Sequence, residues 1–361
     1  MSEDTDITSP PSVTASWPAS VRQDSNRSDG STSHKSDSIH DILLEKHFQE
    51  HPITRYRANE GPITPYDVLN DLGFTILKLS GSGAYGMVYK VELANQIKGE
   101  NLAALKIINL PSDDTSILKT FRHEVFMLDK VKECPHVLRF FGAFIIDNEA
   151  YITLEYGNAG NFYDYLFARK EPLKEQRARR YFSQMASAID FMHSKGIAHR
   201  DVKLENTMLF KYKDKKSLCK LADFGFSRVM YTPEMGFIMK SRAVGTKPYF
   251  APEIIMNRIN PLLHAEYHPM PPDIWSLGVA LYIMLTMTYP FEFHLDMEAM
   301  LELQRRVTIA DRFVKTRKEL EYELDTSDEC MSMLSELLEV DNEKRIKADA
   351  ILNHQWIKNQ S

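Results

Sequence analysis

The sequence predicts an α+β protein of two lobes, a small lobe with an antiparallel sheet plus one helix and a larger, mostly helical lobe. Its 361 residues indicate two units at about 150 residues per domain. The side chains are 43% hydrophobic, which is enough for a large core. Strand-like apolar runs cluster before Gly160, and helical spacing dominates after it.

The first 71 residues precede both lobes. Residues 1–38 are dense in Ser, Thr, Asp and Pro, a composition that buries too little apolar surface to fold, so we expect a disordered arm. This arm is either a phosphorylatable regulatory tail or an extension without a role. Residues 39–71 are a predicted linker, in which the run HDILLEKHFQE (40–50) fits both a short docking helix and a frayed segment.

The smaller lobe is predicted over residues 72–154. Strand-like runs are expected at 74–79, 87–93, 102–108, 137–145 and 150–155. One helix is expected over 115–131. Its apolar residues Phe121, Val125 and Leu128 share one face at helical spacing.

A hinge at residues 155–160 leads into the larger lobe, predicted over 161–357. Helical periodicity is clearest at 175–193, 272–287 and 330–338. Strand-like pieces of this lobe are confined to 206–210 and 219–222.

Charge and cysteine content exclude several classes of protein. The formal net charge of −6 at pH 7 argues against a dedicated nucleic-acid binder, whose binding face is basic. Cys134, Cys219 and Cys330 lie far apart and form neither a disulfide framework nor a zinc motif, so a reducing compartment fits. The N-terminus lacks a secretory signal pattern, and the most apolar run, 277–287, is far shorter than the roughly 20 residues that span a membrane.

A glycine-rich run lies between two predicted strands. It reads GSGAYGMV (81–88), and its glycines allow a sharp turn and a close approach of backbone amides to phosphate groups. A dinucleotide-binding site would need a helix that begins at the third glycine. Residues 87–91 alternate like a strand instead, which favours a hairpin lid over nucleotide phosphates.

A lysine in an apolar strand follows this run. Lys106 ends the run AALK (103–106), where burial of an ammonium is costly unless anions pair with it. Glu124, on the polar side of the predicted helix, and the phosphates of a nucleotide are its expected partners.

Charged and polar residues are concentrated in HRDVKLEN (199–206), between a long amphipathic helix and a short strand. Asp201 can accept the proton of a substrate hydroxyl, and Lys203 can neutralise charge on a transferring phosphoryl group. Asn206 can hold a divalent cation. Asp223, which follows a short strand and begins the run DFG, provides a carboxylate suited to magnesium between phosphates.

The motifs GSGAYGMV, AALK, HRDVKLEN, DFG and APE (251–253) occur in this order over about residues 72–357, and the sequence thereby resembles the eukaryotic protein kinase family. Lys203, two positions after Asp201, and Thr246 are typical of its serine/threonine branch. Within that branch the runs 223–228 and 273–279 are similar to the calcium/calmodulin-dependent kinase group, with testis-specific serine kinases and checkpoint kinases as the nearest branches.

The resemblance implies a bilobal protein kinase fold that uses ATP and Mg²⁺, with a defined set of site residues. The catalytic residues are Asp201, Lys203 and Lys106, and the magnesium ligands are Asn206 and Asp223. The nucleotide-binding residues are Leu79, Gly81, Ser82, Gly83, Ala84, Tyr85, Gly86, Val88, Ala104, Lys106, Glu155, Gly157 and Met208. Supporting residues are Glu124, Arg200, Thr246, Glu253, Asp273 and Arg345.

The resemblance also implies contacts for the supporting residues. Thr246 is expected to bridge Asp201 and Lys203, and Asp273 to tie the backbone of the catalytic loop to the central helix. Glu253 and Arg345 are expected to form a buried ion pair, which would be strongly destabilising to break.

Two positions depart from the family pattern. An activating phosphate commonly occupies the position four residues before Thr246, which here is Arg242. We therefore expect an activation segment that is ordered without phosphorylation, with phosphorylation of Ser241 or Thr232 as the alternative. Asn161 stands where kinases that prefer basic substrates carry a glutamate, so we expect a weakened basic preference, although Glu205 is still available for a basic residue.

The predicted function is therefore transfer of the ATP γ-phosphoryl group to serine or threonine hydroxyls of protein substrates. The alternatives are a pseudokinase that acts as a binding scaffold and, less well supported, a nucleotide-dependent oxidoreductase. We expect no nucleic-acid or membrane partner. Because the sequence ends at Ser361, we also expect no C-terminal calmodulin-binding segment and no direct control by calmodulin. The expected compartment is the cytoplasm, with the nucleus as the alternative.

Overall fold

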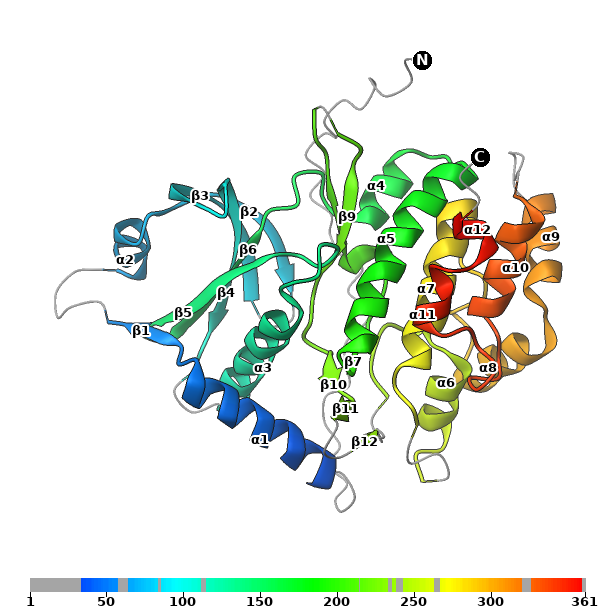
Figure 1. Cartoon of the computed structure of the whole chain (residues 1–361), viewed down its shortest axis with the longest axis horizontal. Helices are drawn as coiled ribbons and strands as arrows, with labels where there is room; N and C mark the ends of the chain where they lie inside the picture. The colour runs from blue at the N-terminus through cyan, green and yellow to red at the C-terminus, as the bar shows by residue number, and fades with distance from the viewer. Residues whose placement is uncertain are drawn as a thin grey trace.

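The computed structural model describes residues 34–57, 64–83, 86–111, 115–213, 215–232, 236–237, 243–262, 267–319 and 326–358 (Figure 1). The arm up to Ser33 lies outside these residues, as do Ala84, Tyr85, Ser241 and Arg242. Figure 1 shows a sheet-rich N-terminal part beside a larger helical part, which confirms the predicted α+β fold of two lobes.

The N-terminal part is built on a six-stranded sheet in the order β1-β5-β6-β4-β3-β2. Neighbouring strands are antiparallel except β1, which runs parallel to β5. The strands are β1 (Thr54–Tyr56), β2 (Phe74–Gly83), β3 (Gly86–Ile97), β4 (Glu100–Asn109), β5 (Phe140–Ile146) and β6 (Glu149–Glu155). The five predicted strands are present, and β1 adds an edge strand that sequence analysis does not predict.

One predicted strand begins later than expected. β5 starts at Phe140 rather than at residue 137, because Val137 instead forms a parallel bridge to Leu221 of the helical part. This bridge joins the sheet-rich part of the molecule to the helical part.

Helix α3 (Thr115–Val131) has the predicted bounds and packs against β5. Its apolar residues Phe121, Val125 and Leu128 are buried in the same core as Ile145 of β5. Glu124 lies three positions after Phe121 and four before Leu128, beside this apolar face, and its carboxylate pairs with Lys106 of β4. The position of α3 therefore depends on the apolar stripe that sequence periodicity indicates.

Two further helices precede the sheet-forming run at β2. Helix α1 (His34–Glu50) begins inside the arm for which disorder is expected, and it includes the run 40–50. It lies along α3 (Figure 1). Helix α2 (Pro65–Asp71) starts with a capping box, in which Thr64 accepts the backbone N–H of Asp67 and Asp67 accepts that of Thr64.

The C-terminal part is mainly helical. Its helices are α4 (Phe162–Ala168), α5 (Glu175–Ser194), α6 (Pro252–Ile259), α7 (Pro271–Thr286), α8 (Met297–Arg306), α9 (Ile309–Glu319), α10 (Asp328–Leu337), α11 (Ala348–Ile351) and α12 (Gln355–Lys358). Helix α7 is apolar on all sides and is buried between α5 and α10. The three predicted helices are present as α5, α7 and α10, each within a residue or two of the expected bounds.

The expectation that strands of this part are confined to two runs is wrong. The predicted runs form the hairpin β8 (Thr207–Phe210) and β9 (Leu218–Leu221). Four two-residue strands are also present, β7 (Ile197–Ala198), β10 (Arg228–Val229), β11 (Tyr231–Thr232) and β12 (Gly236–Phe237). They are too short to produce an alternating pattern, and pairing between distant segments defines them: β7 pairs with β10, and β11 with β12.

Candidate active site

The predicted catalytic residues lie on irregular backbone between short strands. The run from His199 to Lys203 follows β7, and the 3₁₀ helix η1 (Leu204–Asn206) leads into β8. Asp223 follows β9, and the backbone N–H of Ala222 donates to the carbonyl oxygen of Asn206 at 2.8 Å. The β8–β9 hairpin therefore brings Asp223 beside the catalytic loop, 17 residues further along the chain.

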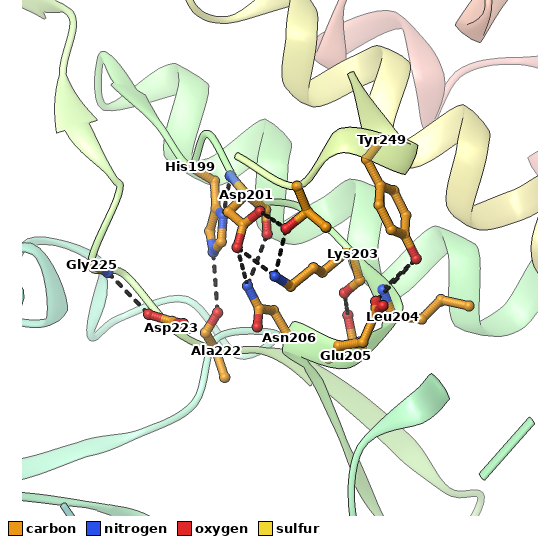
Figure 2. A network of polar contacts seen from close by, with 12 residues as sticks. His199, Asp201, Lys203, Leu204, Glu205, Asn206, Ala222, Asp223, Gly225 and Tyr249 are labelled. Atoms are coloured by element: carbon orange, nitrogen blue, oxygen red, sulfur yellow. Dashed lines mark hydrogen bonds and ion pairs between the residues drawn. The ribbon is translucent and has the colours of Figure 1, made fainter. Parts of the chain in front are cut away.

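Asp201 lies at the centre of a polar network (Figure 2). The hydroxyl of Thr246 donates to its Oδ1 at 2.7 Å, and the ammonium of Lys203 donates to its Oδ2 at 2.8 Å. Lys203 Nζ also donates to Thr246 Oγ1 at 2.7 Å, so the expected bridge by Thr246 is present. Asn206 Nδ2 donates to both the carbonyl oxygen and Oδ2 of Asp201 at 3.0 Å. Three donors thus fix the orientation of this carboxylate.

Asp273, near the start of α7, holds the backbone of the catalytic loop. Its two carboxylate oxygens accept the N–H groups of His199 at 2.8 Å and Arg200 at 2.7 Å. His193 Nε2 lies 3.0 Å from the same carboxylate. Arg200 has a φ of +70°, a conformation that a non-glycine residue keeps only when its surroundings determine it. The tie to the central helix that the resemblance implies is present.

His199 is fully buried and contacts the backbone of Asp201. Its Nε2 lies 3.2 Å from the carbonyl oxygen of Ala222, and its Nδ1 accepts the backbone N–H of Asp201 at 3.3 Å. This pattern requires the neutral tautomer with the proton on Nε2. Burial lowers the pKa of His199, which is consistent with a neutral ring, although Asp273 acts in the opposite direction.

The expected ion pair of Lys106 and Glu124 joins β4 to α3. Lys106 Nζ lies 2.7 Å from both oxygens of the Glu124 carboxylate, and Glu124 is 3% exposed. Burial raises the pKa of Glu124, whereas the ammonium of Lys106 lowers it. The charged form of this carboxylate therefore depends on Lys106.

The register of the sheet places the expected nucleotide-binding side chains on one face. Val88 is directly opposite Lys106, and Ala104 is directly opposite Leu154. Because Ala104 and Lys106 are two positions apart on β4, the side chains of both pairs point to the same face of the sheet. Gly86 needs to be a glycine, because a Cβ there would lie 2.1 Å from the carbonyl oxygen of Ile107.

The remaining residues expected to contact the nucleotide lie around the glycine-rich hairpin and the hinge. Gly81 and Ser82 pair with β3, Leu79 is 54% exposed, and Gly83 pairs with Gly86. At the hinge, a Cβ on Gly157 would lie 3.0 Å from Met208, so this glycine allows the chain to pass close to β8. Ala84 and Tyr85 lie outside the described residues.

The side chain of Glu155 belongs to a buried ionic cluster that sequence analysis does not predict. Its carboxylate lies 2.6 Å from Lys220 Nζ and 2.9 Å from an Arg139 guanidinium nitrogen. Glu155 and Lys220 are 3% and 6% exposed. Lys220 lies in the apolar strand β9, so the argument applied to Lys106, that a lysine in an apolar strand needs an anion, could have identified it.

Asn206 and Asp223 provide oxygen ligands that fit a magnesium ion. Asn206 uses its amide nitrogen for Asp201, which leaves its amide oxygen as the ligand atom. Asp223 is exposed, and one of its oxygens accepts the N–H of Gly225 at 3.2 Å (Figure 2). Within the described part of the chain, no group of three or more His, Cys, Asp or Glu could hold a metal. This two-residue oxygen set suits Mg²⁺, which keeps water and phosphate oxygens as its other ligands.

Glu253 and Arg345 form the expected buried ion pair. The guanidinium donates to both carboxylate oxygens, at 2.6 and 3.0 Å, across 92 residues of sequence. Arg345 also donates to the carbonyl oxygens of Pro271 and Glu339. The pair therefore joins α6, the start of α7 and the segment before α11.

Two side chains of the predicted substrate region, Glu205 and Asn161, have other partners, and Thr232, an alternative phosphorylation site, is buried. Glu205 accepts the hydroxyl of Tyr249 at 3.1 Å, and burial raises the pKa of its carboxyl, although Lys203 opposes this effect. The side chain of Asn161 caps α4 by accepting the N–H of Asp164 at 2.8 Å. Thr232 is buried in β11, at 9% exposed.

Comparison with known proteins agrees with this geometry. Residues 74–357 match the protein kinase domain family, and the chain therefore belongs to that family. Members of this family generally use ATP with Mg²⁺ and act on protein substrates. None of the described helices is both long and apolar enough to cross a membrane.

Several serine/threonine kinases are similar to this chain. The probable serine/threonine-protein kinase MARK-A of Dictyostelium discoideum is 31% identical over 82% of this chain and 25% of its own length. The serine/threonine-protein kinase grp of Drosophila melanogaster is 30% identical over 85% of this chain and 54% of its own length. The human SNF-related serine/threonine-protein kinase is 29% identical over 78% of this chain and 33% of its own length. The chain thus spans between a quarter and about half of the length of these relatives.

Proposed function

We propose that this protein is an active serine/threonine kinase, which transfers the γ-phosphoryl group of ATP to hydroxyl groups of protein substrates. The observation that carries this proposal is the fixed carboxylate of Asp201, whose two oxygens accept hydrogen bonds from Thr246 and Lys203. A carboxylate held in this way can receive a proton from a hydroxyl placed against it.

The nucleotide would bind between the sheet and β8. Val88, Ala104 and Met208 provide apolar contacts for the adenine ring, and the backbone of Glu155 and Gly157 provides polar groups at the hinge. The glycine-rich run and Lys106 hold the phosphates. Because Glu124 pairs with Lys106, the ammonium is already held in place when the nucleotide phosphates arrive.

Magnesium, when bound by Asn206 and Asp223, would neutralise phosphate charge. The protein residues do the rest. As the substrate oxygen bonds to the γ-phosphorus, Asp201 takes the hydroxyl proton and the bond from the γ-phosphorus to the bridging oxygen of ADP breaks. The ammonium of Lys203 stabilises the negative charge on the phosphoryl oxygens.

The pseudokinase alternative would be favoured by loss of a catalytic side chain. Here Lys106 and Glu124 form their ion pair, and Asp201 and Asn206 lie within hydrogen-bond distance of each other. An active enzyme accounts for this arrangement more simply than a scaffold does. The oxidoreductase alternative requires a helix at the end of the glycine-rich run, where the chain forms β3.

The finer assignment also belongs to this proposal. Sequence motifs favour the calcium/calmodulin-dependent kinase group, with the cytoplasm as the compartment and the nucleus as the alternative. We assign residues 1–38 to an arm, 39–71 to a linker, 72–154 and 161–357 to the two lobes, and 155–160 to the hinge between them.

The test is transfer from labelled ATP with Mg²⁺ to a mixed library of Ser, Thr and Tyr peptides, followed by identification of the phosphorylated residue type. Nucleotide binding is measured in parallel. Phosphoserine or phosphothreonine that disappears in Asp223→Asn supports the proposal. Nucleotide binding without transfer supports the scaffold, and phosphotyrosine alone contradicts the assignment to the serine/threonine branch.

A further inference from the structure

Helix α1 and strand β1 lie before residue 74, where the match to the kinase family begins, yet both pack on the N-terminal lobe. In Figure 1, α1 runs alongside α3, the helix that carries Glu124. Segment 34–56 is therefore an addition to the family domain that contacts one of its catalytic elements.

The contact between the two helices is apolar at its centre and charged at its edge. Leu44, His47 and Phe48 of α1 are 5%, 8% and 7% exposed. The ring of His47 meets that of Phe126 edge to face, with the ring centroids 5.1 Å apart. Arg122 lies 4.7 Å from the centroid of the Phe48 ring.

An ion pair connects the same two helices. Arg122 of α3 lies 3.2 Å from a carboxylate oxygen of Glu45, and these side chains are 28% and 61% exposed. Because the pair is near solvent, it contributes little free energy on its own and chiefly fixes the register of the two helices.

The residues of α3 that meet α1 lie on the side of the helix away from Glu124. Arg122 and Phe126 are four positions apart and share one face. At about 100° per residue, Glu124 lies roughly 200° around the helix from Arg122. Helix α3 is thus packed between α1 on one side and Lys106 on the other.

The end of α1 is also attached to the sheet. After Pro52, β1 pairs with β5, with Arg55 opposite Ile145. A cavity of about 220 Å³ lies between this connection and α3, lined by Phe48, Pro52, Ile53, Arg55, Leu118, Arg122 and Ile145. The buried side chains of Leu44, His47 and Phe48 therefore carry the helix contact, with the partly buried Leu43 beside them.

We propose that α1 holds α3 in the position at which Glu124 pairs with Lys106, which makes Leu44 and Phe48 positioning residues for phosphoryl transfer. This inference rests on the proposed kinase activity. When α1 is detached, α3 is free to move away from β4, and Lys106 loses the partner that directs it toward the phosphates.

The test compares the full chain with the double variant Leu44→Ala/Phe48→Ala. Truncation of two buried apolar side chains should shift the equilibrium between attached and detached α1 enough to lower kcat by roughly tenfold or more. Backbone amides of residues 115–131 should exchange hydrogen faster in this variant. Ile42→Ala is the matched control, because Ile42 lies on the same helix and is 66% exposed. Both quantities should be unchanged in this control.

A second set of variants leaves the buried side chains intact, in case the double variant does not fold. Glu45→Arg places two positive charges together and should change both readouts in the same direction by a smaller factor. Adding Arg122→Glu should recover part of the loss, because the ion pair is restored in reversed order.

The two readouts separate the possible failures. Unchanged kcat and unchanged exchange in the Ala and Arg variants would overturn the inference, as would a loss of kcat without faster exchange of α3. A wild-type chain that transfers no phosphoryl group would contradict the proposed function, and the exchange rates would still decide whether α1 holds α3.

Discussion

Thr246 donates its hydroxyl hydrogen to Asp201 across 45 residues of sequence, at an oxygen–oxygen distance of 2.7 Å. The same hydroxyl accepts a hydrogen bond from Lys203 at 2.7 Å. Thr246 lies directly before the 3₁₀ helix η2 (Lys247–Tyr249), so the placement of η2 helps to orient the carboxylate of Asp201 in the catalytic loop.

The hydroxyl of Thr246 should matter more than its shape. Thr246→Val keeps the volume and removes both hydrogen bonds, so Asp201 loses one of its fixed donors. We expect kcat to fall about 10- to 100-fold, with the dissociation constant of ATP unchanged. Thr246→Ser retains the hydroxyl and should remain within a few-fold of wild type. Steady-state kinetics that show equal rates for the Val and wild-type chains would contradict this role.

Lys106 and Glu124 should act as one unit. Lys106→Met removes the ammonium from the phosphates and leaves a buried carboxyl, whose pKa burial already raises, without its counter-charge. We expect each of Lys106→Met and Glu124→Gln to lower kcat, Lys106→Met by about 100-fold or more. The double variant should be scarcely worse than Lys106→Met alone. Independent, multiplicative losses in this cycle would show that the two residues work separately.

The cluster of Glu155, Lys220 and Arg139 should contribute to stability. Lys220→Met leaves a buried carboxylate with only Arg139 as a partner, so the free energy of unfolding should fall by about 3 kcal/mol. Urea denaturation measures this change. Glu155→Gln/Lys220→Met removes both charges and should recover much of it. A single variant as stable as wild type would indicate that Arg139 alone compensates Glu155.

His47 should make attachment of α1 dependent on pH. The facing titratable and charged groups are Glu50 at the end of α1, His51 directly after it, and Asp129 and Lys130 on α3. Burial lowers the pKa of His47 below its usual value of 6.5, so detached α1 binds more protons than attached α1 in acid. Attachment is therefore complete above about pH 6.5 and weakens as pH falls through the lowered pKa.

An NMR titration of the His47 ring tests this expectation. The resonance is assigned by its absence in His47→Asn, and its pKa should lie below 6.5 in the folded protein. A value at or above 6.5 would show that Asp129 and Glu50 outweigh burial, and attachment would then not weaken in mild acid.

Motifs and periodicity predict much of the catalytic centre. The apolar stripe of Phe121, Val125 and Leu128 predicts helix α3. The alternation of apolar and polar residues after Gly86 predicts a hairpin instead of a dinucleotide-binding site. The ion pair of Lys106 and Glu124 follows from the high free energy of a buried lysine without an anion.

Other features depend on contacts between distant segments. The face of α1 that is buried is the one that contacts Arg122 and Phe126 of α3, which lie far along the chain. The composition near His34 indicates disorder rather than a helix. Strand β1 has three residues and is defined by pairing with β5. The roles of Asp273 and Thr246 come from family resemblance, since nothing local to either residue shows that it meets the catalytic loop.

The most direct test of the central claim is phosphoryl transfer by Asp201→Asn beside wild type, with Asp349→Asn as an exposed control on α11. Loss of the base should lower kcat about 10²- to 10⁴-fold, while ATP binding and the unfolding transition stay the same. The control should match wild type. Transfer by Asp201→Asn at the wild-type rate would contradict the assignment of Asp201 as the residue that accepts the proton of the substrate.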